Sequence, residues 1–118
     1  MENRPMKILI IEDDIEDCNL FKECAKKRED IEIIAITDSD IEGLKIVKTK
    51  HPEGIVLDLE LNNSETGSID SLEFLSNLRK LNLNYVPIVI VTTHVNSKRT
   101  YDILHRNGVD IILYKDNP

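Results

Sequence analysis

The chain has 118 residues, of which 41% are hydrophobic, and its 22 acidic and 15 basic side chains give a net charge of −7. This length fits one domain, and the apolar content is enough for a core, which argues against a disordered chain. The negative charge argues against direct binding to nucleic acid or to an anionic membrane. The sequence has no apolar run of 18 residues and no amino-terminal signal region, so we expect a cytoplasmic protein.

The cysteines and histidines form no recognisable metal-binding pattern. Cys18 and Cys24 fall in one predicted helix, about 9 Å apart along its axis, which is too far for a disulfide. We expect both thiols to be reduced and buried. His51, His94 and His105 lack the spacing of metal ligands, and solvated side chains are expected for all three.

Short apolar runs alternate along the chain with segments whose apolar residues recur every three or four positions. The runs predict strands at 7–11, 31–36, 55–58, 88–92 and 110–115. The segments between them predict helices near 12–26, 37–51, 71–81 and 96–107, each opened by Ser, Asp or Asn. The stretch from Glu60 to Asp70 is polar and rich in turn residues, which predicts a long loop.

This alternation predicts an α/β domain with a parallel sheet and helices on both faces. We expect a flavodoxin-like, doubly wound sheet of five strands in the order 2-1-3-4-5. The run before Asp58 has no polar interruption, which is typical of a strand buried on both faces. In this arrangement ligands bind at the carboxyl ends of the strands, where the first and third strands are neighbours.

Carboxylates follow these two neighbouring strands. Glu12 and Asp13 come directly after the first strand, and Asp58 ends the third. Because neighbouring strands lie about 4.8 Å apart, the three groups would share one cleft, and they cannot all stay ionised unless a cation joins them. Oxygen ligands of this kind suit Mg²⁺ or Mn²⁺.

A hydroxyl and an ammonium group follow the last two strands. Thr92 ends the fourth strand and Lys115 ends the fifth, so both would lie near Asp58. The backbone N–H of Thr93 would be placed to bind a phosphoryl oxygen. A nucleophilic carboxylate, a divalent metal, a hydroxyl and an ammonium are together what phosphoryl transfer to an aspartate requires.

With these residues in this order and spacing, the chain resembles the receiver domain of a two-component response regulator. The resemblance extends from Lys7 to Lys115. It implies that Asp58 is the phosphoacceptor and that Glu12 and Asp13 hold the metal. The backbone of Glu60 would add a carbonyl ligand to the metal and would lie beside the phosphoryl group.

The same resemblance implies that Thr92 is the switch hydroxyl and that Lys115 pairs with the phosphoryl group. The phosphoryl donor would be a sensor histidine kinase or a phosphotransfer protein. The domain would act as a signalling switch and would pass its state to an output domain or a downstream protein, without catalysing turnover of a substrate.

The sequence departs from the family pattern at several positions. The loop after Asp58 is longer than usual, and Ser71 stands where the family usually has glycine. Asp116 replaces a cis-bonded proline after the lysine, and Ile112 stands at the position of an aromatic switch residue. A cis bond before Asp116 would cost roughly 3 kcal/mol, so a trans bond is expected.

The resemblance implies that residues 1–118 form one receiver domain, and we expect the family's final helix to be missing from this stretch. Alternation points Ile111 and Leu113 to one face of the sheet, and Ile112 and Tyr114 to the other. Without a fifth helix, part of the apolar surface of the last two strands would face water, and such patches usually bind a partner. We therefore expect a helix or output domain beyond Pro118, or a second chain, as in a homodimer, to cover it.

Two other functions compete with the phosphoacceptor hypothesis. A phosphatase of the haloacid dehalogenase type also uses Asp, Thr, Lys and Mg²⁺. It needs a second aspartate where this chain has Glu60, and its functional groups follow the strands in the reverse order, so it is disfavoured. The second is a pseudo-receiver that binds proteins without being phosphorylated, which the residue after Lys115 and the long loop leave open.

Overall fold

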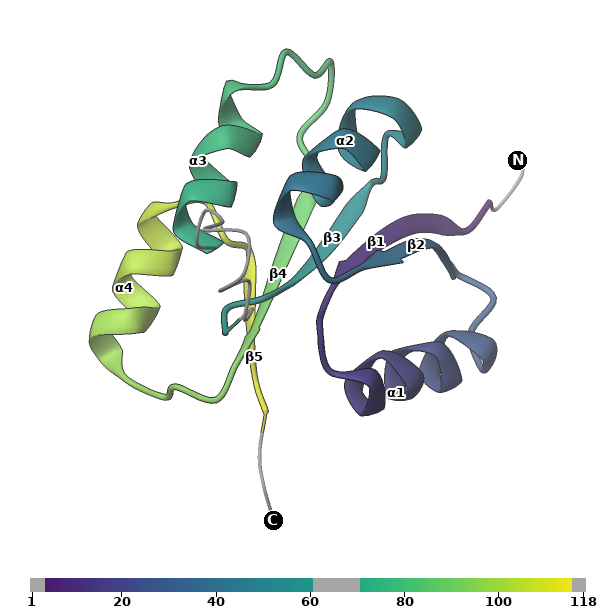
Figure 1. Cartoon of the computed structure of the whole chain (residues 1–118), viewed down its shortest axis with the longest axis horizontal. Helices are drawn as coiled ribbons and strands as arrows, with labels where there is room; N and C mark the ends of the chain where they lie inside the picture. The colour runs from purple at the N-terminus through teal and green to yellow at the C-terminus, as the bar shows by residue number, and fades with distance from the viewer. Residues whose placement is uncertain (1–3, 61–70, 116–118) are drawn as a thin grey trace.

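The computed structural model describes residues 4–60 and 71–115, and these form a parallel five-stranded sheet with helices on both faces (Figure 1). The strand order is β2-β1-β3-β4-β5, which confirms the predicted doubly wound α/β architecture. The strands are β1 (Met6–Ile11), β2 (Ile31–Thr37), β3 (Gly54–Asp58), β4 (Ile88–Thr93) and β5 (Ile111–Tyr114). The helices are α1 (Ile15–Lys26), α2 (Asp40–Lys50), α3 (Ser71–Lys80) and α4 (Lys98–Arg106).

Capping side chains mark where α1, α2 and α4 begin. The Asp14 carboxylate accepts hydrogen bonds from the first backbone N–H groups of α1, and Ser39 and Ser97 cap α2 and α4 in the same way. After α4 the chain reverses at Gly108, whose backbone φ of +83° is a conformation that residues other than glycine rarely adopt. These local signals lie in the sequence, so the helix starts agree closely with the predicted ones.

The hydrophobic core lies mainly between the sheet and the layer formed by α2, α3 and α4. All five residues of β3 are buried, as the uninterrupted apolar run predicted. The core side chains are Leu9, Ile11, Val47, Ile55, Leu57, Phe74, Leu75, Leu78, Val89, Val91, Leu104 and Val109. This core holds the central strands in place, and their carboxyl ends carry the candidate functional groups.

Helix α1 covers the other face of the sheet less completely. Cys18, Phe21 and Ala25 form its inner stripe, but they are only half-buried, and α1 has no fully buried residue. Both cysteines are free, and Cys24 is exposed, so the expectation that both thiols are buried is wrong for Cys24. It lies one residue before Ala25, to one side of the stripe that contacts the sheet.

The edge strand β5 has large apolar side chains in contact with solvent. Ile111 is 46% exposed and Leu113 is 48% exposed, and Ile88 on β4 is 39% exposed. Ile112, which points to the opposite face, packs against the core. The expectation that apolar surface of the last two strands faces water is therefore confirmed, and what covers it stays a prediction.

Two of the predicted departures from the family pattern fall outside the described residues. They are the loop from residue 61 to 70 and the position of Asp116, including the peptide bond that precedes it. Among the helices within residues 4–60 and 71–115, none has the length and apolar character that crossing a membrane requires.

A matched pair of leucines tests how unevenly the sheet is covered. Leu57 on β3 is fully buried, whereas Leu113 on β5 is 48% exposed. Leu57→Ala should lower the free energy of unfolding by about 2–5 kcal/mol, because it leaves a cavity in the core. Leu113→Ala should lower it by less than about 1 kcal/mol, because little burial is lost.

Urea denaturation of both variants, followed by circular dichroism, measures the two losses. Equal losses would contradict the prediction, because they would mean that Leu113 is buried in solution. Light scattering on the same samples would then report whether a second copy of the chain covers β5.

Candidate phosphoacceptor and metal site

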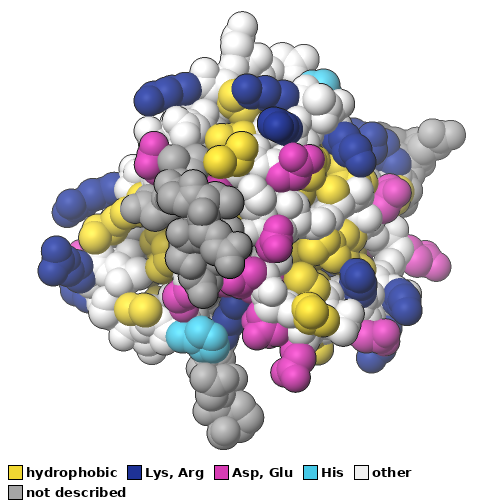
Figure 2. All heavy atoms as spheres, viewed as in Figure 1, with side chains coloured by type: hydrophobic (Ala, Val, Ile, Leu, Met, Phe, Trp, Pro, Cys, Tyr) yellow, Lys and Arg dark blue, Asp and Glu magenta, His cyan; other side chains and the backbone are white. Residues whose placement is uncertain are grey.

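The register of the sheet brings the functional groups together at the carboxyl ends of the strands. Ile11 of β1 pairs with Leu57 of β3, so the residues that follow them, Glu12 and Asp58, are neighbours. Asp58 pairs in turn with Thr92 of β4. In Figure 2, Asp and Glu side chains gather in the lower centre of the face in view, where the strands end in Figure 1.

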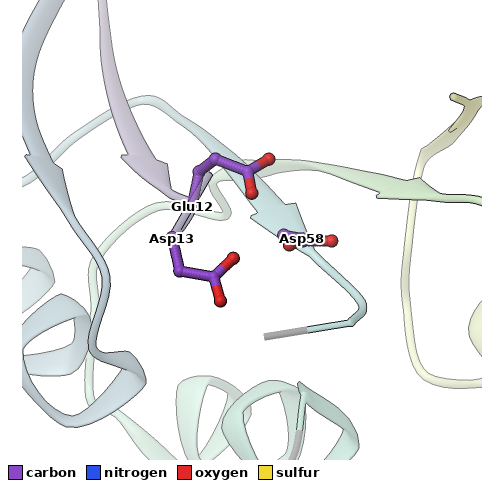
Figure 3. Close-up of side chains that lie close together, drawn as sticks. All are labelled: Glu12, Asp13 and Asp58. Atoms are coloured by element: carbon purple, nitrogen blue, oxygen red, sulfur yellow. The ribbon is translucent and has the colours of Figure 1, made fainter. Parts of the chain in front are cut away.

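Three carboxylates converge at this edge. Carboxylate oxygens of Glu12, Asp13 and Asp58 all lie within 4.8 Å of one another (Figure 3). Glu12 and Asp58 are 2% and 3% exposed, whereas Asp13 is open to solvent. Burial raises the pKa of Glu12 to about 7, and its contact with the Asp58 carboxyl group adds to the shift. The cluster therefore carries more negative charge than its surroundings readily stabilise.

The ammonium group of Lys115 partly balances this charge. Its Nζ lies 2.9 Å from Glu12 Oε1, 3.0 Å from Asp17 Oδ2 and 3.3 Å from Asp58 Oδ1. Burial by itself would lower the pKa of Lys115. The hydrogen bonds to Glu12 and Asp17 and the charge of Asp58 outweigh burial and raise the pKa above its usual value. Lys115 is therefore a fixed positive charge beside Asp58.

The hydroxyl of Thr92 lies on the β4 side of Asp58. Its Oγ1 is buried and makes no hydrogen bond within the part of the chain that the structure describes. A buried hydroxyl without a partner is costly and calls for an explanation, such as a water, ion or ligand that would complete its hydrogen bonding. The neighbouring Thr93 is also fully buried, and its hydroxyl accepts a hydrogen bond from the N–H of Val95.

Hydrogen bonds also hold the backbone on either side of the β3–α3 loop. The N–H of Glu60 donates to Asp58 Oδ1 at 3.1 Å, so Asp58 orders the chain that follows it. Ser71, at the start of α3, donates from its hydroxyl to the backbone oxygens of Asp58 and Leu59, at 3.1 and 3.2 Å. The serine that replaces the family's glycine therefore has a structural role at the site.

The structure adds three side-chain contacts that the sequence analysis missed. The Asp17 carboxylate pairs with the Lys115 ammonium. Glu60 Oε1 accepts a hydrogen bond from the backbone N–H of His94 at 2.5 Å. His94 is exposed, as expected, and its ring nitrogen Nδ1 also lies 3.0 Å from the carbonyl oxygen of Lys115. A signal existed only for Asp17, which lies in the first turn of α1, three residues after the capping residue Asp14 and therefore near the end of β1.

The donor set fits a hard divalent cation. The three clustered groups offer only carboxylate oxygens, which Mg²⁺ and Mn²⁺ prefer. Burial and the contact with Asp58 disfavour the charged form of Glu12 and raise its pKa, and a bound cation would favour that charged form. The expected further ligand, the backbone carbonyl of Glu60, lies at the start of the adjoining loop.

Comparisons with known proteins agree with this geometry. Over 109 residues the chain is 28% identical to a protein-glutamate methylesterase/protein-glutamine glutaminase of Nitrosomonas europaea, covering 92% of this chain and 29% of the relative. The chain spans 27% to 30% of the length of the methylesterase relatives that it matches.

Solved structures share the fold. A DNA-binding response regulator of the LuxR family from Staphylococcus aureus has a TM-score of 0.78 at 26% identity, over 96% of this chain and 88% of that one. The Mn²⁺-bound form of the response regulator Rcp1 has a TM-score of 0.80 at 23% identity, over 97% and 84% of the two chains.

A family model matches nearly the whole chain. Residues 8–117 match the response regulator receiver domain, a range that starts in β1 and includes every site residue named above. This range, the strand order and the acidic cluster agree, and the chain belongs to the receiver domain family of two-component response regulators.

Proposed function

We propose that Asp58 accepts a phosphoryl group from a phosphohistidine of a sensor kinase or a phosphotransfer protein in the cytoplasm. The observation that carries this proposal is the position of Lys115, whose Nζ lies 3.3 Å from Asp58 Oδ1 and 2.9 Å from Glu12 Oε1. A carboxylate nucleophile thus lies beside a positive charge that can bind a phosphoryl oxygen.

The transfer needs little from the protein beyond positioning and charge. An Asp58 oxygen forms the new O–P bond while the N–P bond of the donor breaks, and the departing imidazole keeps the electron pair of that bond. Lys115 pairs with one equatorial oxygen of the phosphoryl group. The buried hydroxyl of Thr92 donates a hydrogen bond to another, which would give that group the partner it lacks within the described chain.

Glu12, Asp13, Asp58 and the backbone carbonyl of Glu60 would hold Mg²⁺ or Mn²⁺. When bound, the cation supplies positive charge that offsets the charge on the transferring group. The backbone N–H groups of Glu60 and Thr93 would bind phosphoryl oxygens. The Glu60 N–H already donates to Asp58 Oδ1, so it points toward the reacting carboxylate.

The phosphorylated domain would act on an output domain or a separate protein. The chain spans 29% of the length of the relative from Nitrosomonas europaea, so the methylesterase activity in that relative's name is not assigned to this chain. A pseudo-receiver is the second candidate. The Lys115 ammonium is already paired with Glu12 and Asp17, so its charge does not require a phosphoryl group as a partner.

Incubation with acetyl phosphate and Mg²⁺ should add one phosphoryl group to the wild-type chain, as measured by intact-protein mass spectrometry. Asp58→Asn should take up none, because an amide is a poor nucleophile. Asp14→Asn is the matched control: it removes the same charge nearby, and asparagine caps a helix as well as aspartate does.

The control should be phosphorylated like the wild type. Phosphorylation of the Asp58→Asn protein would place the acceptor elsewhere. A folded wild-type protein that takes up no phosphoryl group, from acetyl phosphate or from a phosphohistidine donor, would favour the pseudo-receiver.

The affinity for Mg²⁺ should rise with pH. The pKa of Glu12 is raised to about 7, so below that pH the cation must displace a proton to bind. Affinity should therefore increase roughly tenfold between about pH 6 and 8. Glu12→Gln should bind more weakly and lose this dependence, and Asp13→Ala should abolish binding while the fold persists.

Calorimetric titration at several pH values measures these affinities. A flat profile in the wild type would argue against Glu12 as a ligand, and unchanged affinity in Asp13→Ala would argue against the acidic pair.

A further inference from the structure

Among the described residues, Asp17 is the one partner of the Lys115 ammonium that lies outside the carboxylate cluster. An ammonium has three N–H donors, and three carboxylate oxygens surround Nζ at 2.9, 3.0 and 3.3 Å, from Glu12, Asp17 and Asp58. Glu12 and Asp58 also belong to the group that fits a divalent cation, and Asp17 does not. Asp17 therefore has one electrostatic role at the site, which is to pair with Lys115.

The position of Asp17 is set by the cap of α1. Its backbone N–H donates to Asp14 Oδ1 at 3.1 Å, which fixes the first turn of the helix next to the end of β1. From there its side chain, 33% exposed, reaches the Lys115 side chain, which is 15% exposed. The contact thus joins α1 to the end of β5, two segments that are far apart in sequence.

A divalent cation would change the balance around Lys115. The cation would share the oxygens of Glu12 and Asp58, and its charge would repel the ammonium. Of the three carboxylates, Asp17 alone would still have its full charge for Lys115. Without Asp17, the only described side chains that pair with Nζ would be Glu12 and Asp58, whose charge the cation shares, so they would hold the ammonium less firmly.

We propose that Asp17 is a positioning residue, which holds the ammonium of Lys115 beside Asp58 when a divalent cation occupies the carboxylate cluster. The functional meaning of this role rests on the proposed phosphoryl transfer. The ion pair itself exists without it, so the two can be tested separately.

The test follows the Lys115 ammonium by proton–nitrogen NMR in the full chain, with and without Mg²⁺, its signal assigned by its loss in Lys115→Arg. In the wild type a hydrogen-bonded ammonium should give a resolved signal in both conditions. In Asp17→Asn the signal should persist without Mg²⁺, because Glu12 and Asp58 remain, and disappear when Mg²⁺ is added. Asp17→Glu should restore it, since the carboxylate returns.

Glu16→Gln is the matched control. Glu16 lies in the same first turn of α1, is exposed, and is not a partner of Lys115, so the variant removes the same charge without touching the ion pair. Its Lys115 signal should match the wild type. At saturating Mg²⁺, phosphorylation by acetyl phosphate should slow roughly two- to fivefold in Asp17→Asn, and not in Glu16→Gln.

A Lys115 signal that survives Mg²⁺ in Asp17→Asn, or equal losses in Asp17→Asn and Glu16→Gln, would overturn the inference. So would a wild-type chain in which Mg²⁺ shifts no signal of the site. If the wild type binds Mg²⁺ but accepts no phosphoryl group, the proposed function fails, and the NMR comparison still decides the role of Asp17.

Discussion

The site depends on the ion pairs between one ammonium group and the carboxylates at the edge of the sheet. Four acidic side chains, Glu12, Asp13, Asp17 and Asp58, lie around Lys115 or within the adjoining cluster. One positive charge cannot balance them, and burial together with the contact to Asp58 raises the pKa of Glu12. A buried cluster with surplus negative charge is poorly stabilised alone and is well suited to a divalent cation.

The topology of the sheet makes this concentration of charge unavoidable. Parallel strands end at the same edge, and the order 2-1-3-4-5 places the strand before Glu12 beside the strand before Asp58. The core under α2, α3 and α4 holds these strands rigidly, so their end residues cannot move apart to relieve repulsion. The packing of the central strands thus stabilises the fold despite the repulsion among the carboxylates at their carboxyl ends.

Sequence patterns predicted the features that depend on neighbours along the chain. Strand runs and capping residues are confirmed, because periodicity and local hydrogen bonding determine them. The strand order is also confirmed, and it follows from the doubly wound arrangement that the alternation of strands and helices predicted. The proximity of Glu12, Asp13, Asp58 and Lys115 also agrees with the prediction, since parallel strands align their ends. Their roles in phosphoryl transfer stay predictions.

The missed contacts depend on side chains that meet only in three dimensions. Asp17 was overlooked because helix periodicity shows which side of α1 it faces, but not that the side chain of Lys115 crosses to it. The residue type of Cys24 predicted an interior position, although the residue falls beside the half-buried inner stripe of α1. Residue preferences describe averages, and a single position is decided by the surface that packs against it.

The contacts of Glu60 and His94 close a ring around the candidate acceptor. The backbone N–H of Glu60 donates a hydrogen bond to Asp58 Oδ1, and the Glu60 carboxylate accepts one from the backbone N–H of His94. The His94 ring nitrogen Nδ1 contacts the carbonyl oxygen of Lys115. The ion pair between Lys115 Nζ and Asp58 Oδ1, at 3.3 Å, completes this ring of contacts. The ends of β3, β4 and β5 are thereby linked through side chains as well as through the sheet. Hydrogen bonds in such a network support one another, so the geometry around Asp58 is fixed by the ring as a whole, more firmly than by any one of its members.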